Sequence, residues 1–223
     1  MAGSEIRVIT DLDSMHETLA VQEAAWGFDD FEKVPSRLML VSSKVGGLML
    51  GCYNEDRLIG CSYSGCGCKP TGEVYLHSHM TALLPEHQGR GLGYELKMRQ
   101  RTKALERGFN LIEWTFDPFE SRNAHFNIEK LGVICRSYEP NLYGITTSRL
   151  HGGLPTDRLV AEWRLDEPRS TREVEAEIKV PGERTHEAQS EVRQRFTDCF
   201  SGGLAVIGHR RNEGQNTYLL AKL

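Results

Sequence analysis

The residues best suited to chemistry lie in one short stretch, Pro85–Gly93, which reads PEHQGRGLG. Glycines stand at every second position, 89, 91 and 93, so the backbone can turn tightly and approach a ligand closely. The run before the stretch predicts a β-strand and the run after it predicts a helix. A helix that begins here directs free N–H groups and the positive end of its dipole at the turn. The stretch therefore predicts an anion site suited to a phosphate or pyrophosphate.

Two histidines on the preceding strand are candidates for proton transfer. His77 and His79 are two residues apart, so in a strand they point to the same face. An imidazole titrates near neutral pH, which suits a general base. The alternative is that both are ordinary strand residues and that a water chain carries the proton. Glu73 and Glu113 are weaker candidates for the same role.

Other motifs are less specific. The glycine run is G-x-G-x-G, whereas a dinucleotide fingerprint needs G-x-G-x-x-G and a Walker A loop needs Gly-Lys-Ser/Thr. A purely structural glycine turn stays open as an alternative. Cys66 and Cys68 form a C-x-C pair, but no second Cys or His pair follows at the spacing of a zinc site. We therefore expect no metal.

Strands and helices alternate around these residues. Hydrophobic periodicity and turn residues predict the order βααβββαβαβ to about residue 138, which indicates a mixed α/β class. A further strand, Leu159–Leu165, is followed by a polar segment, 166–171, that we take as a boundary. A βαββ pattern then completes the chain. The elements expected on either side of the glycine run are the strand Val74–Leu84 and the helix Leu92–Arg107, followed by the strand Phe109–Phe116 and the helix Ser121–Leu131.

Composition places broad limits on the function. The 223 residues are 39% hydrophobic and 26% charged, as is ordinary for a soluble globular protein. The net charge of -4 argues against a nucleic-acid binder, which would usually be basic. No apolar run is long enough to span a bilayer, and the first residues lack a signal-peptide core. Six cysteines suit free thiols in a cytoplasmic protein.

The chain resembles the GNAT superfamily of acyl-CoA-dependent N-acyltransferases. Gln88–Gly93 matches its Q/R-x-x-G-x-G/A signature without a gap, and Ala82–Glu86 looks like the strand end before it. Asn123-Ala124 and Glu129–Gly132 look like the family's later helix motif. The resemblance covers about three quarters of the chain. It implies a twisted mixed sheet flanked by helices in residues 1–165, with 166–223 as a small α+β extension packed on this core, similar to a subgroup of predicted acetyltransferases.

The resemblance implies acetyl-CoA or another acyl-CoA as the cosubstrate. In the family the strand before the glycine turn bulges, and the pantetheine arm binds the backbone there, here near Ala82 and Leu83. The N–H of Leu83 would then stabilise the oxyanion. Arg90, Lys97 and Arg101 could meet phosphates, although Lys97 and Arg101 are expected on a solvated helix face. The implied binding residues are Ala82, Leu83, Leu84, Gln88, Gly89, Arg90, Gly91, Leu92, Gly93, Asn123, Phe126 and Asn127.

The acid and base are less well defined. His77 occupies the position, six residues before Leu83, where one branch of the family has its base. The family's usual acid is a tyrosine just before the E-K-x-G sequence, but this chain has Ile128 there, and isoleucine cannot donate a proton. Either Tyr138 or Tyr143 substitutes, or Asn127 positions the sulfur, or solvent protonates the thiolate.

The acceptor is the least defined part. The resemblance favours a primary amine of a small molecule, such as an amino acid, that attacks directly in a ternary complex. A protein lysine or N-terminus, or a CoA-binding module without catalysis, are the alternatives. Trp26, Phe28 and Phe31 either line the acceptor pocket or belong to the core, and the loop 152–156 either borders it or is plain surface. We expect a monomer or a homodimer, and no nucleic-acid or membrane partner.

Overall fold

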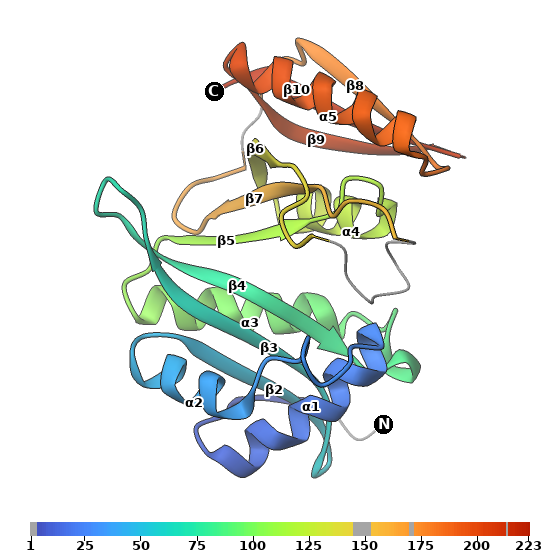
Figure 1. Cartoon of the computed structure of the whole chain (residues 1–223). Helices are drawn as coiled ribbons and strands as arrows, with labels where there is room; N and C mark the ends of the chain where they lie inside the picture. Colours follow the sequence, from blue (N-terminus) through green and yellow to red (C-terminus); the bar gives the residue numbers. More distant parts are fainter. Residues whose placement is uncertain (1–3, 145–152, 170–171, 213) are drawn as a thin grey trace. The chain divides into compact units, whose positions relative to one another are not determined.

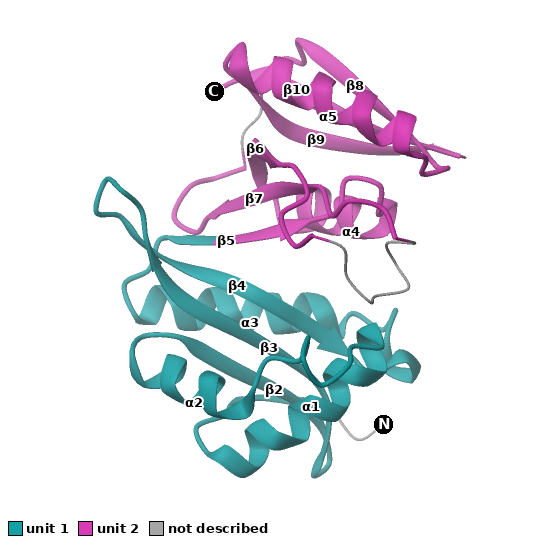
Figure 2. Ribbon diagram, viewed as in Figure 1, with its two compact units in different colours: residues 1–112, 147–150 teal, residues 113–146, 151–223 magenta. Residues whose placement is uncertain are grey.

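The computed structural model describes residues 4–144, 153–169, 172–212 and 214–223, and its elements follow the expected order (Figure 1). The mixed α/β class is confirmed. The chain divides into two compact units, residues 1–112 with 147–150 and residues 113–146 with 151–223 (Figure 2). This division groups residues by their contacts and does not test whether the chain has a domain boundary after residue 165. That boundary stays a prediction.

The first unit is an antiparallel sheet covered by helices. Its strands are hydrogen-bonded in the order β1-β2-β3-β4. Helices α1 and α2 pack on β3, whereas α3 packs on β2 and β4. The elements are β1 (Ser4–Val8), α1 (Leu12–Trp26), α2 (Ser36–Lys44), β2 (Leu48–Asn54), β3 (Arg57–Cys68), β4 (Val74–Leu83), a 3-10 turn (Pro85–His87) and α3 (Leu92–Glu106).

Local signals account for the ends of α1. The Asp11 side chain accepts a hydrogen bond from the N–H of Ser14, 2.8 Å away, which satisfies one of the helix's free donors. Gly27 ends the helix with a φ of 69°, a left-handed conformation that glycine adopts without strain. These two residues explain why the helix begins at Leu12 and ends at Trp26.

The pairing of β3 with β4 contains a bulge. Tyr63 pairs with Met80 and Ser64 pairs with Ser78, so His79 is an extra residue on β4 with no partner of its own. On either side of it the buried residues of β4 alternate with more exposed ones, as expected of a strand with one face on a core.

The described residues of the second unit form six strands, ordered β5-β7-β6-β9-β10-β8, of which β5 begins with the last two residues of the first unit, 111 and 112. Strand β9 pairs with β6 through Cys135 and Val206, so the C-terminal βαββ segment extends this sheet. Helix α5 packs on β6, β8 and β9. The elements are β5 (Leu111–Phe116), α4 (Ser121–His125), a π-helical turn (Phe126–Lys130), β6 (Ile134–Glu139), β7 (Arg158–Arg164), β8 (Ala176–Pro181), α5 (His186–Ser201), β9 (Leu204–Asn212) and β10 (Gln215–Lys222).

The helix expected at Ser121–Leu131 changes type halfway. After His125 it widens into a π-turn, in which the N–H of Leu131 bonds the carbonyl of Phe126 five residues back. Such turns are rare and often occur at functional sites. No helix in the described part of the chain is long and apolar enough to cross a membrane.

The six cysteines differ in burial and lie in different parts of the fold. Cys52, Cys61 and Cys135 are buried, whereas Cys66 and Cys68 are exposed near the end of β3. None of the six forms a disulfide. The described residues also contain no group of three or more His, Cys, Asp or Glu that could hold a metal ion.

Candidate functional site

The glycine turn has the conformation that its sequence indicates. Gly89 and Gly91 have φ values of 74° and 87°, where a residue with a Cβ would be strained. Gly91 caps α3 without any side-chain hydrogen bond to the helix end. Within the described residues, the N–H groups of Gly91, Leu92 and Gly93 donate to no acceptor. They are therefore available to an anion at the start of a 15-residue helix.

Gln88 ties the turn back to the strand before it. Its Nε2 donates to the carbonyl oxygen of Leu83 at 3.2 Å. The N–H of Leu84 donates to Ile59 on β3, and hydrogen-bonded pairs alternate along an antiparallel ladder. The N–H of Ala82 therefore also faces β3, whereas those of Thr81 and Leu83 face away from it. Of the three strand residues expected to bind CoA, only Leu83 has its N–H on the outer side.

The two candidate bases lie on the same strand, at its bulge. The rings of His77 and His79 are 6.2 Å apart between centroids. Burial, followed by the neighbouring His79 and Lys97, lowers the pKa of His77. His79 is exposed at the surface of the strand, yet desolvation by the groups around its ring lowers the pKa of His79 as well. Both imidazoles are therefore neutral near pH 7 and able to accept a proton.

Lys97 does not lie on a solvated helix face, so that expectation is wrong. Only 4% of it is exposed, and its Nζ donates to Ser78 Oγ at 2.8 Å. Burial lowers the pKa of Lys97 to about 7. It belongs to a buried polar cluster of α3, β3 and β4 that consists of Lys97, Gln100, Ser62, Ser64 and Ser78. The cluster was missed because a lysine and a glutamine in a helix full of charged residues resemble its solvated side.

The binding residues expected later in the chain lie in the second unit, on α4 and its π-turn. Asn123 is exposed, Phe126 is half-buried and Asn127 is buried. The Nδ2 of Asn127 donates to Asn123 Oδ1 at 3.3 Å. Ile128, at the position of the family's usual acid, is a fully buried core residue.

Tyr138 has its hydroxyl group engaged. Its Oη donates to Asp157 Oδ2 at 2.8 Å, and its ring stacks on Phe196. Burial and the nearby Asp157 carboxylate raise the pKa of Tyr138 far above its ordinary value. Asp157 is itself fixed by Arg193, at 2.8 Å and 2.9 Å. This arrangement suits a structural anchor better than a proton donor.

Tyr143 is more accessible, at 46% exposed. Its Oη lies 2.9 Å from Thr115 Oγ1, and the Arg158 guanidinium lies 5.4 Å from the ring centroid. Its backbone N–H donates to Thr156 Oγ1.

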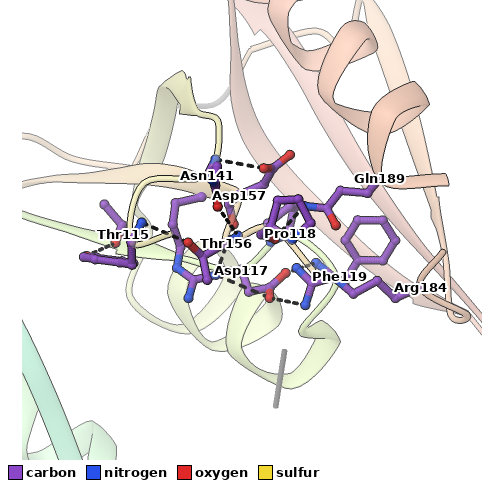
Figure 3. A network of polar contacts seen from close by, with 12 residues as sticks. Thr115, Asp117, Pro118, Phe119, Asn141, Thr156, Asp157, Arg184 and Gln189 are labelled. Carbon is purple, nitrogen blue, oxygen red and sulfur yellow. Dashed lines mark hydrogen bonds and ion pairs between the residues drawn. The ribbon is translucent and has the colours of Figure 1, made fainter. Parts of the chain in front are cut away.

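Figure 3 shows the polar network that supports this loop. Thr156 and Asp157 form hydrogen bonds with residues 141–144. The Asp157 carboxylate accepts a hydrogen bond from the N–H of Asn141 at 2.9 Å. Asp117 pairs with Arg184 at 2.8 Å. Burial alone would raise the pKa of Asp157, but its bonds from Arg193, Asn141 and Tyr138 lower it on balance.

The remaining candidates are scattered. Glu113 is buried in β5 and Glu73 is half-buried before β4. Trp26 and Phe28 stack at 5.3 Å, whereas Phe31 is 99% exposed and is not a core residue. Of the loop 152–156, residue 152 lies outside the described residues. One hollow of about 590 Å³ is lined by residues of the second unit such as Phe119, His125 and Arg211, and by none of the predicted site residues.

Comparisons with known proteins agree on the fold. The sequence matches no protein-family model and no curated protein. Among solved structures, a Desulfovibrio desulfuricans protein assigned to the GNAT family of acetyltransferases is similar, with a TM-score of 0.59 and 15% identity over 73% of this chain and 99% of that chain. The PaiA N-acetyltransferase of Thermoplasma acidophilum, solved with coenzyme A, has a TM-score of 0.52 and 15% identity over 73% and 99%.

The ribosomal-protein-S18-alanine N-acetyltransferase of Escherichia coli is similar too. It has a TM-score of 0.58 and 12% identity, over 74% of this chain and 96% of that chain. Nearly the whole length of each neighbour is matched, while about a quarter of this chain has no counterpart. The chain therefore has the GNAT acetyltransferase fold.

Proposed function

We propose that this protein is an N-acyltransferase that transfers an acetyl or other short acyl group from acyl-CoA to a primary amine. The observation that carries the proposal is the turn after β4, where two left-handed glycines precede a helix whose first N–H groups have no acceptor in the described chain. The Q-x-x-G-x-G spacing and the GNAT fold support coenzyme A as the anion's source.

The binding of CoA would use two parts of the first unit. The N–H groups of Gly91, Leu92 and Gly93 would bind the pyrophosphate at the positive end of α3. The outward N–H groups of Thr81 and Leu83 would bond the pantetheine arm along β4. Ala82 and Leu84 would contribute side-chain contacts only, since their N–H groups serve β3. Asn123, Phe126 and Asn127 remain proposed contacts.

The reaction would be a direct displacement. The amine nitrogen attacks the thioester carbonyl carbon and forms the N–C bond, and the carbonyl electrons move to oxygen. Collapse of this oxyanion breaks the C–S bond and releases the CoA thiolate. The ammonium gives a proton to a base, and the thiolate takes one from an acid or from water. The products are an amide and CoA.

The distances along β4 limit which oxyanion donor and which base could act together. A strand rises by about 3.3 Å per residue, so His77 and His79 lie roughly 20 Å and 13 Å along β4 from Leu83. A carbonyl bonded at Leu83 would be too far from either imidazole. Bonded at Thr81, it would lie within about 7 Å of His79, or one water away. We therefore favour Thr81 as the oxyanion donor and His79 as the base.

The proposed acid is Tyr143, because it is 46% exposed and its hydroxyl meets the neutral hydroxyl of Thr115, whereas the hydroxyl of Tyr138 is part-buried and already donates to the carboxylate of Asp157. Protonation of the thiolate by water stays an alternative. The acceptor is a small-molecule amine in our proposal. A peptide N-terminus is the second candidate, since one neighbour acetylates the alanine of a ribosomal protein.

A thiol-release assay tests the proposal. The purified chain is incubated with acetyl-CoA or succinyl-CoA and a panel of amino acids, polyamines and short peptides, and free CoA thiol is measured over time. We expect release that depends on one class of amine and an amide product of matching mass. Tight CoA binding by calorimetry without turnover of any amine or peptide would contradict the enzymatic proposal and favour a CoA-binding module.

A further inference from the structure

The bulge at His79 leaves the candidate base without a strand partner. Tyr63 and Ser64 of β3 pair with Met80 and Ser78, so His79 is skipped by the ladder. Bulges bend a strand and redirect a side chain, and they recur beside active sites. A residue freed in this way needs another contact to hold its side chain in one orientation.

Tyr63 supplies such a contact. Its ring meets the His79 imidazole edge to face, with centroids 5.9 Å apart and the planes inclined by 69°. This geometry is a favoured one for aromatic pairs and adds to what burial alone contributes. Only 6% of Tyr63 is exposed, so its own rotamer is fixed by packing.

Ser42 fixes the far end of the Tyr63 ring. The Tyr63 Oη lies 2.7 Å from Ser42 Oγ in the last turn of α2. The hydroxyl also lies 4.0 Å from where a Cβ at Gly65 would stand, and no other atom comes within that distance. Because Gly65 pairs with His77, it leaves open space on the face that carries the imidazoles.

We propose that Tyr63, anchored by Ser42, is a positioning residue that holds the His79 imidazole towards the acceptor amine. The inference rests on the proposed function, in which His79 is the base. Tyr63 takes no proton and touches no reacting atom. It acts by limiting the rotamers of a side chain that the strand ladder does not constrain.

Three variants separate the parts of this arrangement. Tyr63→Phe keeps the ring but removes the bond to Ser42, and Ser42→Ala removes the same bond from the other side. Tyr63→Leu removes the ring and frees His79. Tyr53→Phe is the matched control, because it removes the hydroxyl of another buried tyrosine, on the adjacent strand β2, while keeping the ring over which Arg7 lies.

The expected result is a selective loss of kcat. Tyr63→Phe and Ser42→Ala should each lower kcat about threefold to tenfold, and Tyr63→Leu should approach the loss caused by His79→Gln, on the order of 100-fold. The KM for acyl-CoA should stay within about twofold, and Tyr53→Phe should match the wild type. Equal kcat in Tyr63→Phe, Ser42→Ala and the wild type would overturn the inference.

A second measurement does not depend on activity. The NMR signals of the His79 ring should shift and broaden in Tyr63→Leu, because the neighbouring ring is lost and several rotamers become populated, while those of His77 move less. Unchanged His79 signals would also overturn the inference. If the wild type turns over no amine at all, the proposed function fails, but the NMR comparison still reports whether Tyr63 holds His79.

Discussion

Gly91 and Gly93 stand two residues apart in the same turn, yet the backbone requires glycine at only one of them. Gly91 has a φ of 87°, which costs a residue with a Cβ about 1–2 kcal/mol. Gly93 is not in that region, and a Cβ there would lie an ordinary 3.8 Å from Leu83. The turn can relieve strain at Gly91 only by redirecting the N–H groups that follow.

We therefore expect Gly91→Ala to weaken CoA binding about tenfold, corresponding to about 1.4 kcal/mol. Gly93→Ala is the matched control and should change the Kd by less than about threefold. Isothermal titration with CoA measures both. Equal losses of affinity in the two variants would mean that glycine is needed at both positions for contact with the ligand, rather than for the backbone conformation.

The neutral imidazole of His79 predicts a specific pH dependence. Desolvation by the surrounding groups places the pKa of His79 below the ordinary 6.5, so the fraction able to accept a proton rises as pH increases through that lower value. The kcat/KM for the acceptor should therefore show an acidic limb that levels off by about pH 7.

His79→Gln should remove this limb and lower kcat/KM on the order of 100-fold. His77→Gln is the comparison, because it removes the neighbouring imidazole, 6.2 Å away, and leaves the proposed base in place. Initial rates between pH 5 and 9 measure the profiles. Persistence of the same limb in His79→Gln would reject His79 as the base.

At the scale of elements, breaking the buried polar cluster between α3 and the sheet should lower the free energy of unfolding. Gln100 is fully buried, and its Nε2 lies within 3.2 Å of three hydroxyl oxygens, those of Ser62, Ser64 and Ser78. Buried hydroxyl groups that lose their partner each cost about 1–3 kcal/mol.

Gln100→Leu should therefore destabilise the fold by about 2–4 kcal/mol. Gln194→Leu makes the same exchange on the exposed side of α5 and should cost less than about 0.5 kcal/mol. Urea unfolding followed by circular dichroism measures both. A cost for Gln100→Leu as small as that of Gln194→Leu would show that the hydroxyl groups find other partners.

Elements with local signals could be predicted from the sequence, and those set by distant pairing could not. Asp11 and Gly27 mark the ends of α1, and the glycine run marks the start of α3. The bulge at His79 depends on the register between two strands, which no single strand encodes. The π-turn at Phe126 keeps the periodicity of a helix closely enough to be taken for one.

The same distinction applies to the candidate site. The glycine turn and the two histidines lie close together in the sequence, so they could be chosen as candidates, and their roles stay predictions. Burial of Lys97 and the bond from Tyr138 to Asp157 were not predicted, because each depends on a partner 19 residues away. Residue type alone indicated a solvated cation at Lys97 and an available hydroxyl group at Tyr138. In the structure both groups donate hydrogen bonds to partners brought close by the tertiary fold.

At the scale of the whole molecule, the C-terminal segment is part of the second unit's core. Strand β9 continues the sheet beside β6, and Phe196 of α5 contacts both Tyr138 and Tyr218. The His209 ring lies in this core, 4.9 Å from that of Tyr218 and 6.2 Å from that of His125. It is 3% exposed, and within the described residues neither ring nitrogen has a hydrogen-bond partner.

This burial makes folding stability depend on pH. Desolvation, and then the neighbouring His125, lowers the pKa of His209 to about 4, against about 6.5 in an unfolded chain. Between these values the unfolded chain binds a proton that the folded chain does not, so stability from this group falls as pH decreases. At pH 5 the loss relative to pH 7.5 is about 2 kcal/mol.

His209→Phe should remove that loss while keeping a ring against Tyr218. The free energy of unfolding of the variant, relative to the wild type, should therefore rise by about 2 kcal/mol between pH 7.5 and pH 5. Urea unfolding followed by fluorescence measures it, since Trp114 and Trp163 lie together in the same unit. His16→Phe replaces an exposed histidine of α1 and serves as the control. A parallel fall in stability for the wild type and His209→Phe would assign the acid sensitivity to other groups.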